Sequence, residues 1–365
     1  MRIVFASHTA QTGVFRVGSH HLSREYALAG HDVTHVATPV SLLHLARIRQ
    51  ESMRRRFDAV AGSPRADEHG VHHVVPQIVA PPARLPAGLA RINLEHPRKG
   101  WPRLLRLDQG PIDVLFIDQP QFADLIPKVD ASLVVYRPTD AHFDARTRAL
   151  EVRALNQSHA IIATSASVLA DVARDHTHLP SLIVENGVEF ERFAKARGAV
   201  REGAVYVGAL DSRFDWDALG AMAQENPGVP FRIGGPLAST VPNKLPSNVE
   251  LLGPIPYDSA PALLASAAVG LLPLSDHPGN AGRSPMKFFE YLAAGLAVVA
   301  TGSPELRRRQ APGVVLYGDG KTANLAFSEA LKSAETLGDD GSEYARQFDW
   351  AQRMRLSESF IKGIR

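Results

Sequence analysis

Residues 284–300 read SPMKFFEYLAAGLAVVA, the pattern of a helix that begins at a loop, ends at a glycine and leads into a strand. Ser284 is a suitable N-cap, and Pro285 is a suitable first helical residue. Gly295 follows the last apolar residues of the helix and ends it. Residues 296–300 are wholly apolar, as in a strand of a parallel sheet. This stretch therefore predicts an α/β fold.

The start of this helix suits a phosphate group. Its first N–H groups have no partner within the helix, and its dipole places positive charge there. Lys287 adds a cation in the first turn, where a cation is normally unfavourable, so a bound anion would explain it. Glu290, one turn further on, is placed to accept hydrogen bonds from a ribose. The alternative is an ordinary amphipathic helix with solvated Lys287 and Glu290.

The composition is that of an ordinary globular protein. The 365 residues suit two domains of roughly 150–200 residues each, and 45% of them are hydrophobic and 21% charged. A net charge of +2 gives no signal for nucleic acid. The absence of cysteine excludes disulfides, thiolate metal sites and cysteine nucleophiles, and it fits a reducing cytosol.

The chain shows no pattern for secretion or for crossing a membrane. Its first residues, MRIVFAS, lack the basic and long apolar regions of a signal peptide. No window reaches the roughly 18 uninterrupted apolar residues of a membrane span. We therefore expect a cytoplasmic protein that is soluble or attached only to a membrane surface.

Strand and helix patterns alternate in both halves of the chain. A strand at 2–7, a helix at 19–28 and a strand at 31–38 form a βαβ unit, which implies a parallel sheet. Further strands of the first half are expected at 113–118, 132–137, 159–164 and 182–184, with a helix near 122–129. Strands of the second half are expected at 204–207, 231–235, 249–253, 269–274, 296–300 and 314–317, with a last helix at 343–361. Residues 189–203 are polar and basic and have the character of a linker.

Polar residues follow two strands of the first half. The carboxyl edge of an open parallel sheet is where such proteins bind ligands. The loop after the first strand offers His8, Arg16 and His20, although it could equally be a solvated loop. Asp140 follows the strand that ends in Arg137, and a carboxylate there is a candidate general base. Alternatively, Asp140 caps the next helix or pairs with Arg137.

A basic segment with one tryptophan lies at residues 91–106. Arginines and a lysine alternate there with Trp101 and leucines, the composition of a helix that lies on an anionic lipid surface. The alternative is a solvated basic helix face with Trp101 in the core, since Pro102 limits the helix.

The second half contains another strand–glycine–helix unit. Its strand ends at Gly208, and the following turn presents N–H groups to a phosphate, with Arg213 as a charged partner or as a solvated side chain. The loop SDHPGNAGR, residues 275–283, then leads into the helix that carries Lys287. Two such α/β halves joined by a linker leave a cleft between their carboxyl edges.

The order of these motifs resembles the nucleotide-sugar-binding domain of GT-B glycosyltransferases. The motifs are VYVGALDSRFDWDAL, FRIGGP, VELLGPIPY, VGLLPL and SPMKFFEYLAAGLAVVAT. A terminal helix with FDW, residues 348–350, is also typical of that family. The resemblance implies an α/β protein of two Rossmann-like domains whose parallel sheets face an interdomain cleft. Its parts are an acceptor-binding domain at 1–188, a linker at 189–203, a nucleotide-sugar-binding domain at 204–342 and a helix at 343–365 that packs back on the first domain.

Three details resemble the xanthan-type glucuronosyltransferase more closely. Many retaining members have two glutamates eight positions apart around the helix, and here Glu290 matches the second while Gly282 stands at the first. VVYRPTD resembles the strand that ends in that enzyme's catalytic aspartate, which maps onto Asp140. SPMKFFEY resembles the segment in which a methionine and a lysine, here Met286 and Lys287, approach the nucleotide.

The resemblance implies a glycosyltransferase that moves a sugar from a nucleotide-sugar, expected to be a UDP-sugar, to a lipid-linked or polysaccharide precursor. Asp140 as general base would make the transfer inverting, by one direct displacement. The expected donor-binding residues are Gly208, Arg213, Gly234, Tyr257, Ser284, Met286, Lys287 and Glu290, and those on the acceptor side are His8, Arg16 and His20. Helix N–H groups and Lys287 would offset the diphosphate charge, so we expect no metal and no cofactor. The segment around Trp101 resembles a membrane-facing segment of that enzyme and implies peripheral attachment to the inner face of the plasma membrane.

Three other functions fit the same residues. A retaining transferase of the same fold is compatible with Glu290. A nucleotide-sugar epimerase has the same two-domain architecture. A non-catalytic sugar-nucleotide or carbohydrate-binding module would need the binding residues alone.

Overall fold

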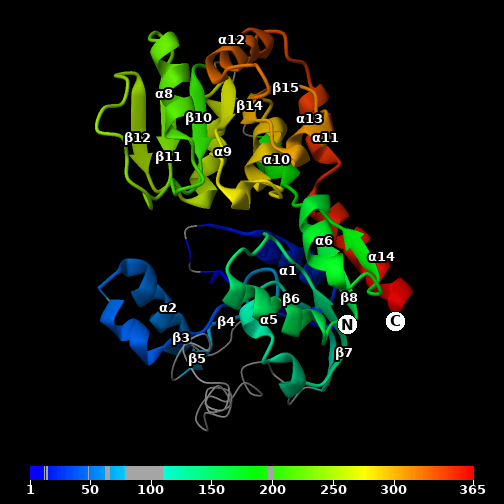
Figure 1. Ribbon diagram of the computed structural model, residues 1–365. Coiled ribbons are helices and arrows are strands. Elements are labelled where there is room, and N and C mark those ends of the chain that lie inside the picture. The colour runs from blue at the N-terminus through cyan, green and yellow to red at the C-terminus, as the bar shows by residue number, and fades with distance from the viewer. Residues whose placement is uncertain (12, 14, 48, 62–65, 79–109, 196–200) are drawn as a thin grey trace. The chain divides into compact units, whose positions relative to one another are not determined.

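The computed structural model describes residues 1–11, 13, 15–47, 49–61, 66–78, 110–195 and 201–365. The chain forms two compact units. Unit 1 comprises Met1–Thr164, Val168–Val184 and Met354–Arg365, and unit 2 comprises Ser165–Ser167 and Glu185–Arg353. Each unit has its own parallel sheet (Figure 1), which confirms the expected α/β class. The segment around Trp101 lies outside the described residues. Among the described residues, no helix is long and apolar enough to span a bilayer.

Unit 1 is built on a seven-stranded sheet of order β4-β2-β1-β6-β7-β8-β9, and every neighbouring pair is parallel. The strands are β1 Arg2–Ala6, β2 Asp32–Val36, β4 Val71–Val74, β6 Ile112–Ile117, β7 Ala131–Tyr136, β8 Ala160–Ala163 and β9 Ser181–Ile183. The short strands β3 Val40–Ser41 and β5 Gln77–Ile78 pair with each other. The helices are α1 Gly18–Leu28, α2 Glu51–Ala61, α5 Ala145–Leu155, α6 Ala166–Val172 and the 3-10 helix η1 Leu42–Arg47.

Aromatic packing joins the central strands of unit 1 to α1 and to the end of the chain. The rings of Phe5 on β1 and Phe116 on β6 stack with centroids 4.5 Å apart. Tyr26 of α1 lies 6.0 Å from each of these rings. Its hydroxyl donates to Ser357 Oγ at 2.9 Å, on helix α14, Trp350–Ile364. This buried contact fixes the last turns of the chain on unit 1.

The helix expected near residues 122–129 is absent. Two short 3-10 turns stand there instead, η4 Pro120–Phe122 and η5 Ile126–Lys128. Each turn contains a proline, which has no N–H to donate and restricts the residue before it. The expectation of a continuous helix was therefore wrong, although Phe122, Leu125 and Ile126 are buried in the core of unit 1.

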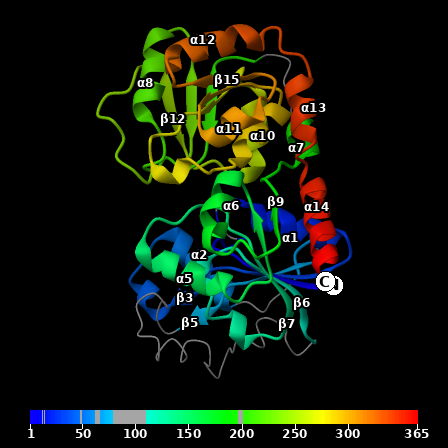
Figure 2. The same ribbon diagram turned by 45° about the vertical axis from the view of Figure 1, so that its right-hand side comes forward.

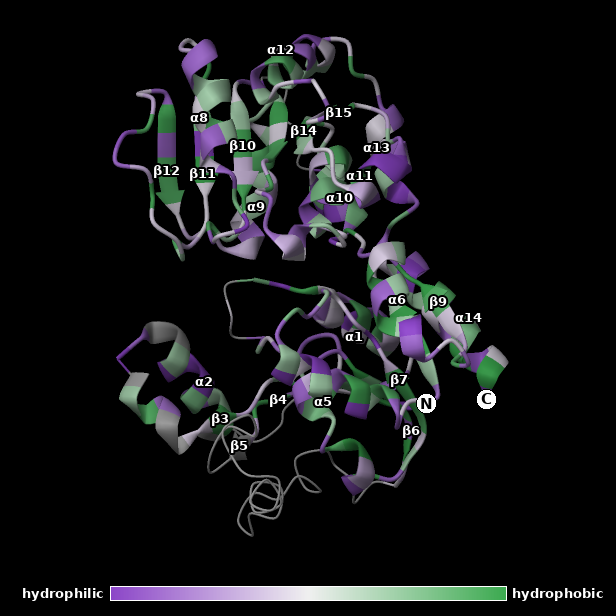
Figure 3. Ribbon diagram, in the orientation of Figure 1, coloured by the Kyte–Doolittle hydropathy of each residue, from purple (hydrophilic) through white to green (hydrophobic). Residues whose placement is uncertain are grey.

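Unit 2 is built on a six-stranded parallel sheet of order β12-β11-β10-β13-β14-β15. The strands are β10 Ala204–Val207, β11 Phe231–Gly234, β12 Val249–Gly253, β13 Val269–Leu272, β14 Ala297–Thr301 and β15 Val314–Tyr317. The helices are α7 Phe190–Ala194, α8 Trp216–Glu225, α9 Ala260–Ala265, α10 Met286–Ala293, α11 Pro304–Arg309, α12 Ala323–Ala334 and α13 Asp340–Arg346. Hydrophobic residues line the central strands of this sheet, while α8 and α13 carry residues of both kinds (Figure 3).

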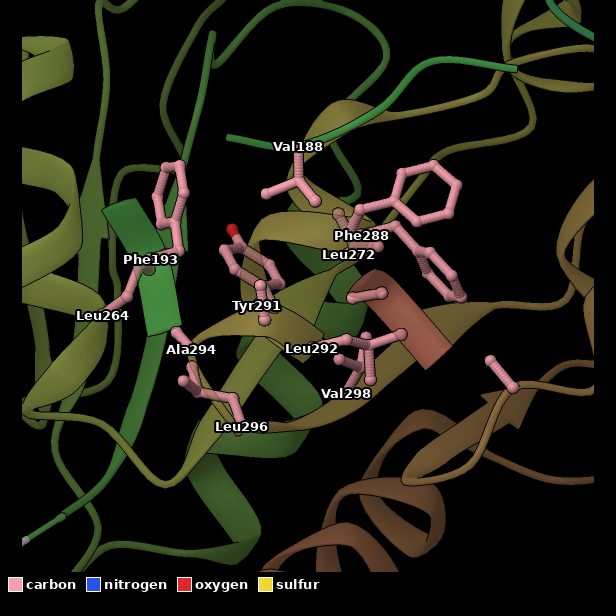
Figure 4. Close-up of a cluster of buried hydrophobic side chains, with 14 of the residues drawn as sticks. Val188, Phe193, Leu264, Leu272, Phe288, Tyr291, Leu292, Ala294, Leu296 and Val298 are labelled. Carbon is pink, nitrogen blue, oxygen red and sulfur yellow. The ribbon is translucent and has the colours of Figure 1, made fainter. Parts of the chain in front are cut away.

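Helices cover both faces of the unit 2 sheet. One core contains side chains of α7, α9, α10 and α13 (Figure 4), and α10 contributes Phe288, Phe289, Tyr291 and Leu292 to it. The other core contains α8 and α12, which pack side by side (Figures 1 and 2). The sheet is therefore doubly wound, and its carboxyl edge is the place for a ligand.

Helix α10 ends as its sequence predicts but begins differently. Gly295 has a φ of 75°, its N–H donates to Leu292 O at 2.9 Å, and the Leu296 N–H donates to Tyr291 O at 3.0 Å, which is a Schellman stop. The N-cap is Pro285 rather than Ser284, and no side chain caps the helix. The prediction of Ser284 as N-cap was wrong because its hydroxyl is engaged by residues of other segments.

Two further segments differ from expectation. Residues 190–194 of the expected linker form α7, whose Phe190 and Phe193 are buried in unit 2. The helix expected at 343–361 is divided into α13 and α14 by residues 347–349. There the Val188 N–H donates to Phe348 O and the Trp350 N–H donates to Val188 O, so the chain breaks its helix to pair with another segment.

Candidate functional site

The loops at the carboxyl ends of β10 and β13 lie side by side in unit 2. Both strands are at the centre of the sheet, where the strand order changes direction. At such a switch point the two following loops diverge and leave room for a ligand. Gly208 and Arg213 follow β10, and the loop after β13 leads to Lys287 on α10. The sheet topology thus brings together residues about eighty positions apart.

Glycines allow the ends of β10 and β11 to approach each other closely. The Gly208 N–H donates to Gly234 O at 2.9 Å. A Cβ on Gly235, which has a φ of 153°, would lie 1.6 Å from Gly208 O. A Cβ on Gly234 would lie 2.5 Å from Ile255 Cγ1. Side chains at these positions would block the approach, so the backbone itself forms this wall of the site.

Lys287 lies against this backbone. A Cβ on Gly208 would be 2.8 Å from Lys287 Nζ, which lies 5.3 Å from the centre of the Tyr206 ring. Burial lowers the pKa of Lys287 to about 8, and the charge of Arg283 acts in the same direction. Within the described part of the chain, the ammonium makes no hydrogen bond or ion pair. The side chain is half-buried, and a partly desolvated cation without a bonded partner is suited to binding an anion.

Glu290 lies one turn further along α10, near a second carboxylate. Burial raises the pKa of the Glu290 carboxyl to about 7, and the Lys287 ammonium opposes this rise. The Glu189 carboxylate also raises it, and it accepts a hydrogen bond from the Tyr257 hydroxyl at 3.1 Å. Arg192 lies over the Tyr257 ring at 5.0 Å. Glu189 thus holds Tyr257 near Glu290. The sequence did not indicate this role of Glu189, because the residue lies in the expected linker.

Arg213 does not stand alone in its loop. Its guanidinium is paired with Asp211, Nη2 to Oδ2 at 2.6 Å, so part of its charge is neutralised. The buried Asn280 Nδ2 donates to Arg213 O and to Ser275 O, both at 3.0 Å. This amide ties the loop after β13 to the loop after β10.

Arg283 is a further cation of the site that sequence reasoning did not single out. Its charge lowers the pKa of Lys287 and acts on Asp211, so it lies within electrostatic range of both. Met286 is the first residue of α10 and is half-buried, with its N–H at the free end of the helix. The glycines before Arg283 indicated an adaptable loop, but nothing in the local pattern indicated that Arg283 lies near Lys287 and Asp211.

In unit 1, the corresponding switch point lies between β1 and β6. His8 follows β1, and its Nδ1 lies 3.5 Å from Gln119 Nε2 after β6. Desolvation lowers the pKa of His8, while the carboxylates of Asp118 and Asp140 oppose this effect. His8 and Asp140 therefore lie close enough to interact at the carboxyl edge of the unit 1 sheet.

Arg137 forms its ion pair with Asp118 and not with Asp140, the partner that the sequence suggested. Arg137 forms a buried bidentate pair with Asp118, at 2.8 and 2.7 Å, and the two side chains are 2% and 1% exposed. Asp144, not Asp140, caps α5 by accepting the Thr147 N–H at 2.8 Å. Asp140 remains half-buried in the loop after β7.

His20 is buried in unit 1. The Val17 N–H donates to His20 Nδ1 at 3.2 Å, and Nε2 lies 3.1 Å from Thr9 O. Both ring nitrogens therefore have backbone partners, and the side chain closes the first turn of α1. Arg16 is half-buried beside it, and its charge lowers the pKa of His20. This geometry favours a structural role for His20.

The fold defines a structural class. The chain has the GT-B fold of glycosyltransferases, which confirms the resemblance seen in the sequence motifs. Sucrose-phosphate synthase from Thermosynechococcus elongatus is similar over 99% of both chains, with a TM-score of 0.71 and 15% identity. HepE from Anabaena, solved in complex with UDP, is similar over 100% of both chains, with a TM-score of 0.66 and 14% identity.

Comparison of the sequence finds a matching family model and a curated relative. Residues 215–357 match the model described as "Glycosyl transferase-like". The putative teichuronic acid biosynthesis glycosyltransferase TuaH of Bacillus subtilis (strain 168) is 31% identical over 190 residues. This match covers 46% of the present chain and 47% of TuaH, so it spans about half the length of the curated relative.

Proposed function

We propose that the chain is a glycosyltransferase that moves a sugar from a UDP-sugar to a lipid-linked or polysaccharide precursor, with inversion and without a metal. The observation that carries this proposal is the ammonium of the half-buried Lys287, which lies beside Gly208 at the start of α10. A diphosphate there would receive helix N–H groups and the charge of Lys287, with Arg283 in range. These groups offset the charge that develops on a leaving UDP.

The remaining donor contacts follow from the same geometry. Glu290 lies one turn beyond Lys287 on α10, and its charge acts on Tyr257, so these two residues would hold the ribose and border the base. The choice of UDP is supported by HepE, which is named in complexes with UDP and with UDP-glucose. The class of acceptor is supported by the name of TuaH, a putative enzyme of teichuronic acid biosynthesis.

Nucleotide binding is the first test. Calorimetry on the full chain should detect UDP and not GDP, and Lys287→Ala should weaken UDP binding by about 10- to 150-fold, since a charge-assisted hydrogen bond is worth roughly 1.5–3 kcal/mol. Unchanged affinity in Lys287→Ala would remove the diphosphate role of this residue.

Asp140 is the proposed general base. It follows β7 at the carboxyl edge of unit 1, and its charge acts on His8 at the same edge. Asp140→Asn should abolish sugar transfer to a lipid-linked glycan while UDP binding persists. Asp144→Asn is the matched control, because asparagine is an equally good N-cap and the residue lies four positions away. Near-normal turnover of Asp140→Asn would exclude Asp140 as the base.

A retaining transfer is the second candidate, because Glu290 occupies the position of the second glutamate of retaining family members. Nuclear magnetic resonance of the product decides between the two, since a UDP-α-sugar gives a β-linked product by inversion and an α-linked product by retention.

A further inference from the structure

The segment before α10 is held by residues from two places where the chain passes between the units. The chain first passes from unit 1 to unit 2 at Ser165. The Ser165 Oγ donates a hydrogen bond to Gly282 O at 2.7 Å. The chain passes from unit 1 to unit 2 a second time at Glu185, and Asn186 is the next residue. The Asn186 Nδ2 donates a hydrogen bond to Ser284 O at 2.7 Å. The Asn186 N–H also reaches Ser284 Oγ at 3.2 Å. Ser165 and Asn186 therefore hold the carbonyl groups of the two residues that flank Arg283.

A buried arginine completes this arrangement within unit 2. The Arg309 side chain is 3% exposed, and its Nη2 donates to Ser284 Oγ at 3.0 Å and to Glu185 Oε1 at 2.7 Å. The guanidinium lies over the rings of Phe288 and Phe289, 5.3 and 4.8 Å from their centres. The hydroxyl of Ser284 is thus held both by Asn186 and by Arg309.

We infer that Asn186 and Ser165 are positioning residues for the donor diphosphate: they set the place of Arg283 and of the first turn of α10. The inference rests on the proposed function. The loop after β13 contains Pro278, Gly279 and Gly282, and a loop of this composition needs external contacts to keep one conformation. Both contacts are made to main-chain oxygens, so they fix the backbone directly. A shift of the loop would change the direction of the helix N–H groups toward a phosphate.

The two passages also connect the diphosphate site to the chain path between the units. Residues 165–167 and 185–188 belong to unit 2, while the residues just before each belong to unit 1. The hydrogen bonds to the oxygens of Gly282 and Ser284 therefore join the loop before α10 to the start of each connection.

The test compares UDP and uridine binding by calorimetry in four full-length variants. Asn186→Ala and Ser165→Ala each remove a hydrogen bond to the loop, and Ser165→Thr keeps the hydroxyl. Asn248→Ala is the matched control, because Asn248 Nδ2 bonds three main-chain oxygens, those of Ala223, Asn226 and Val229, away from α10.

We expect Asn186→Ala and Ser165→Ala to weaken UDP binding by about tenfold, the effect of one well-placed hydrogen bond, and to leave uridine binding unchanged. Ser165→Thr and Asn248→Ala should bind UDP as the unsubstituted chain does. Equal weakening of UDP and uridine would overturn the inference, since general damage to the site would then be the cause. Unchanged UDP affinity in Asn186→Ala, with Lys287→Ala impaired, would overturn it while the proposed function stands. Absence of UDP binding by the unsubstituted chain would refute both.

Discussion

Gly208→Ala should weaken UDP binding without unfolding the protein. The new Cβ would lie 2.7 Å from Lys287 Cε and 2.8 Å from Nζ. Carbon atoms in contact lie roughly 3.5 Å apart, so the end of the lysine must move by about 0.8 Å. The tip of a lysine moves at little cost, but the new Cβ would also lie 2.9 Å from the hydroxyl of the buried Tyr206, so we expect the free energy of unfolding to fall by about 1–3 kcal/mol.

The same displacement matters for the ligand. A hydrogen bond lengthened by about 0.8 Å is largely lost, and a charge-assisted bond is worth roughly 1.5–3 kcal/mol. The dissociation constant for UDP should therefore rise by about 10- to 150-fold in calorimetry. If Gly208→Ala acts through Lys287, the double variant with Lys287→Ala should bind UDP no more weakly than Lys287→Ala alone.

Two other glycines provide controls for this substitution. Gly220 lies within α8 and a Cβ there meets no atom within 4 Å, so Gly220→Ala should be neutral or stabilising and should not change UDP affinity. Gly235→Ala would force a Cβ to within 1.6 Å of Gly208 O and should prevent folding of unit 2. A folded Gly208→Ala variant with unaltered UDP affinity would show that the ammonium does not bind the diphosphate from this position.

Three further predictions concern charge. UDP affinity should decline as the pH rises through about 8, where Lys287 loses its proton in the free protein, and this decline should disappear in Lys287→Ala. Asp118→Ala should cost about 3–5 kcal/mol in urea denaturation, because it leaves the charge of Arg137 buried without its partner; a loss below 1 kcal/mol would contradict a buried pair. Burial holds the pKa of His20 and His35 well below 6.5, so the unfolded chain takes up protons first as the pH falls. Stability should therefore be intact above pH 6.5 and decline below it, and His35→Gln should lessen that decline in thermal melts at pH 7.5 and 5.5.

Much of the fold is visible in local patterns. Most of the strands stand where the apolar runs predict them, within one or two residues, because a buried parallel strand needs apolar side chains on both faces. The patterns did not predict β3, β4 and β5, which are only two to four residues long. Two expected helices also differ, because a local preference competes there with a proline or with a tertiary partner. The segment at 122–129 has helical apolar spacing, but Pro127 interrupts it. The expected last helix breaks at 347–349 to pair with Val188.

By itself the sequence determined the α/β alternation, the helix of residues 286–293 with its stop at Gly295, and the spacing of Lys287 and Glu290 on that helix. These features depend on interactions between residues a few positions apart. Only the tertiary structure decided that Lys287 lies against Gly208 and that Arg137 pairs with Asp118 rather than with Asp140. Such partners are set by the order of strands in the sheets, and the local pattern of a strand does not specify which strand will lie beside it.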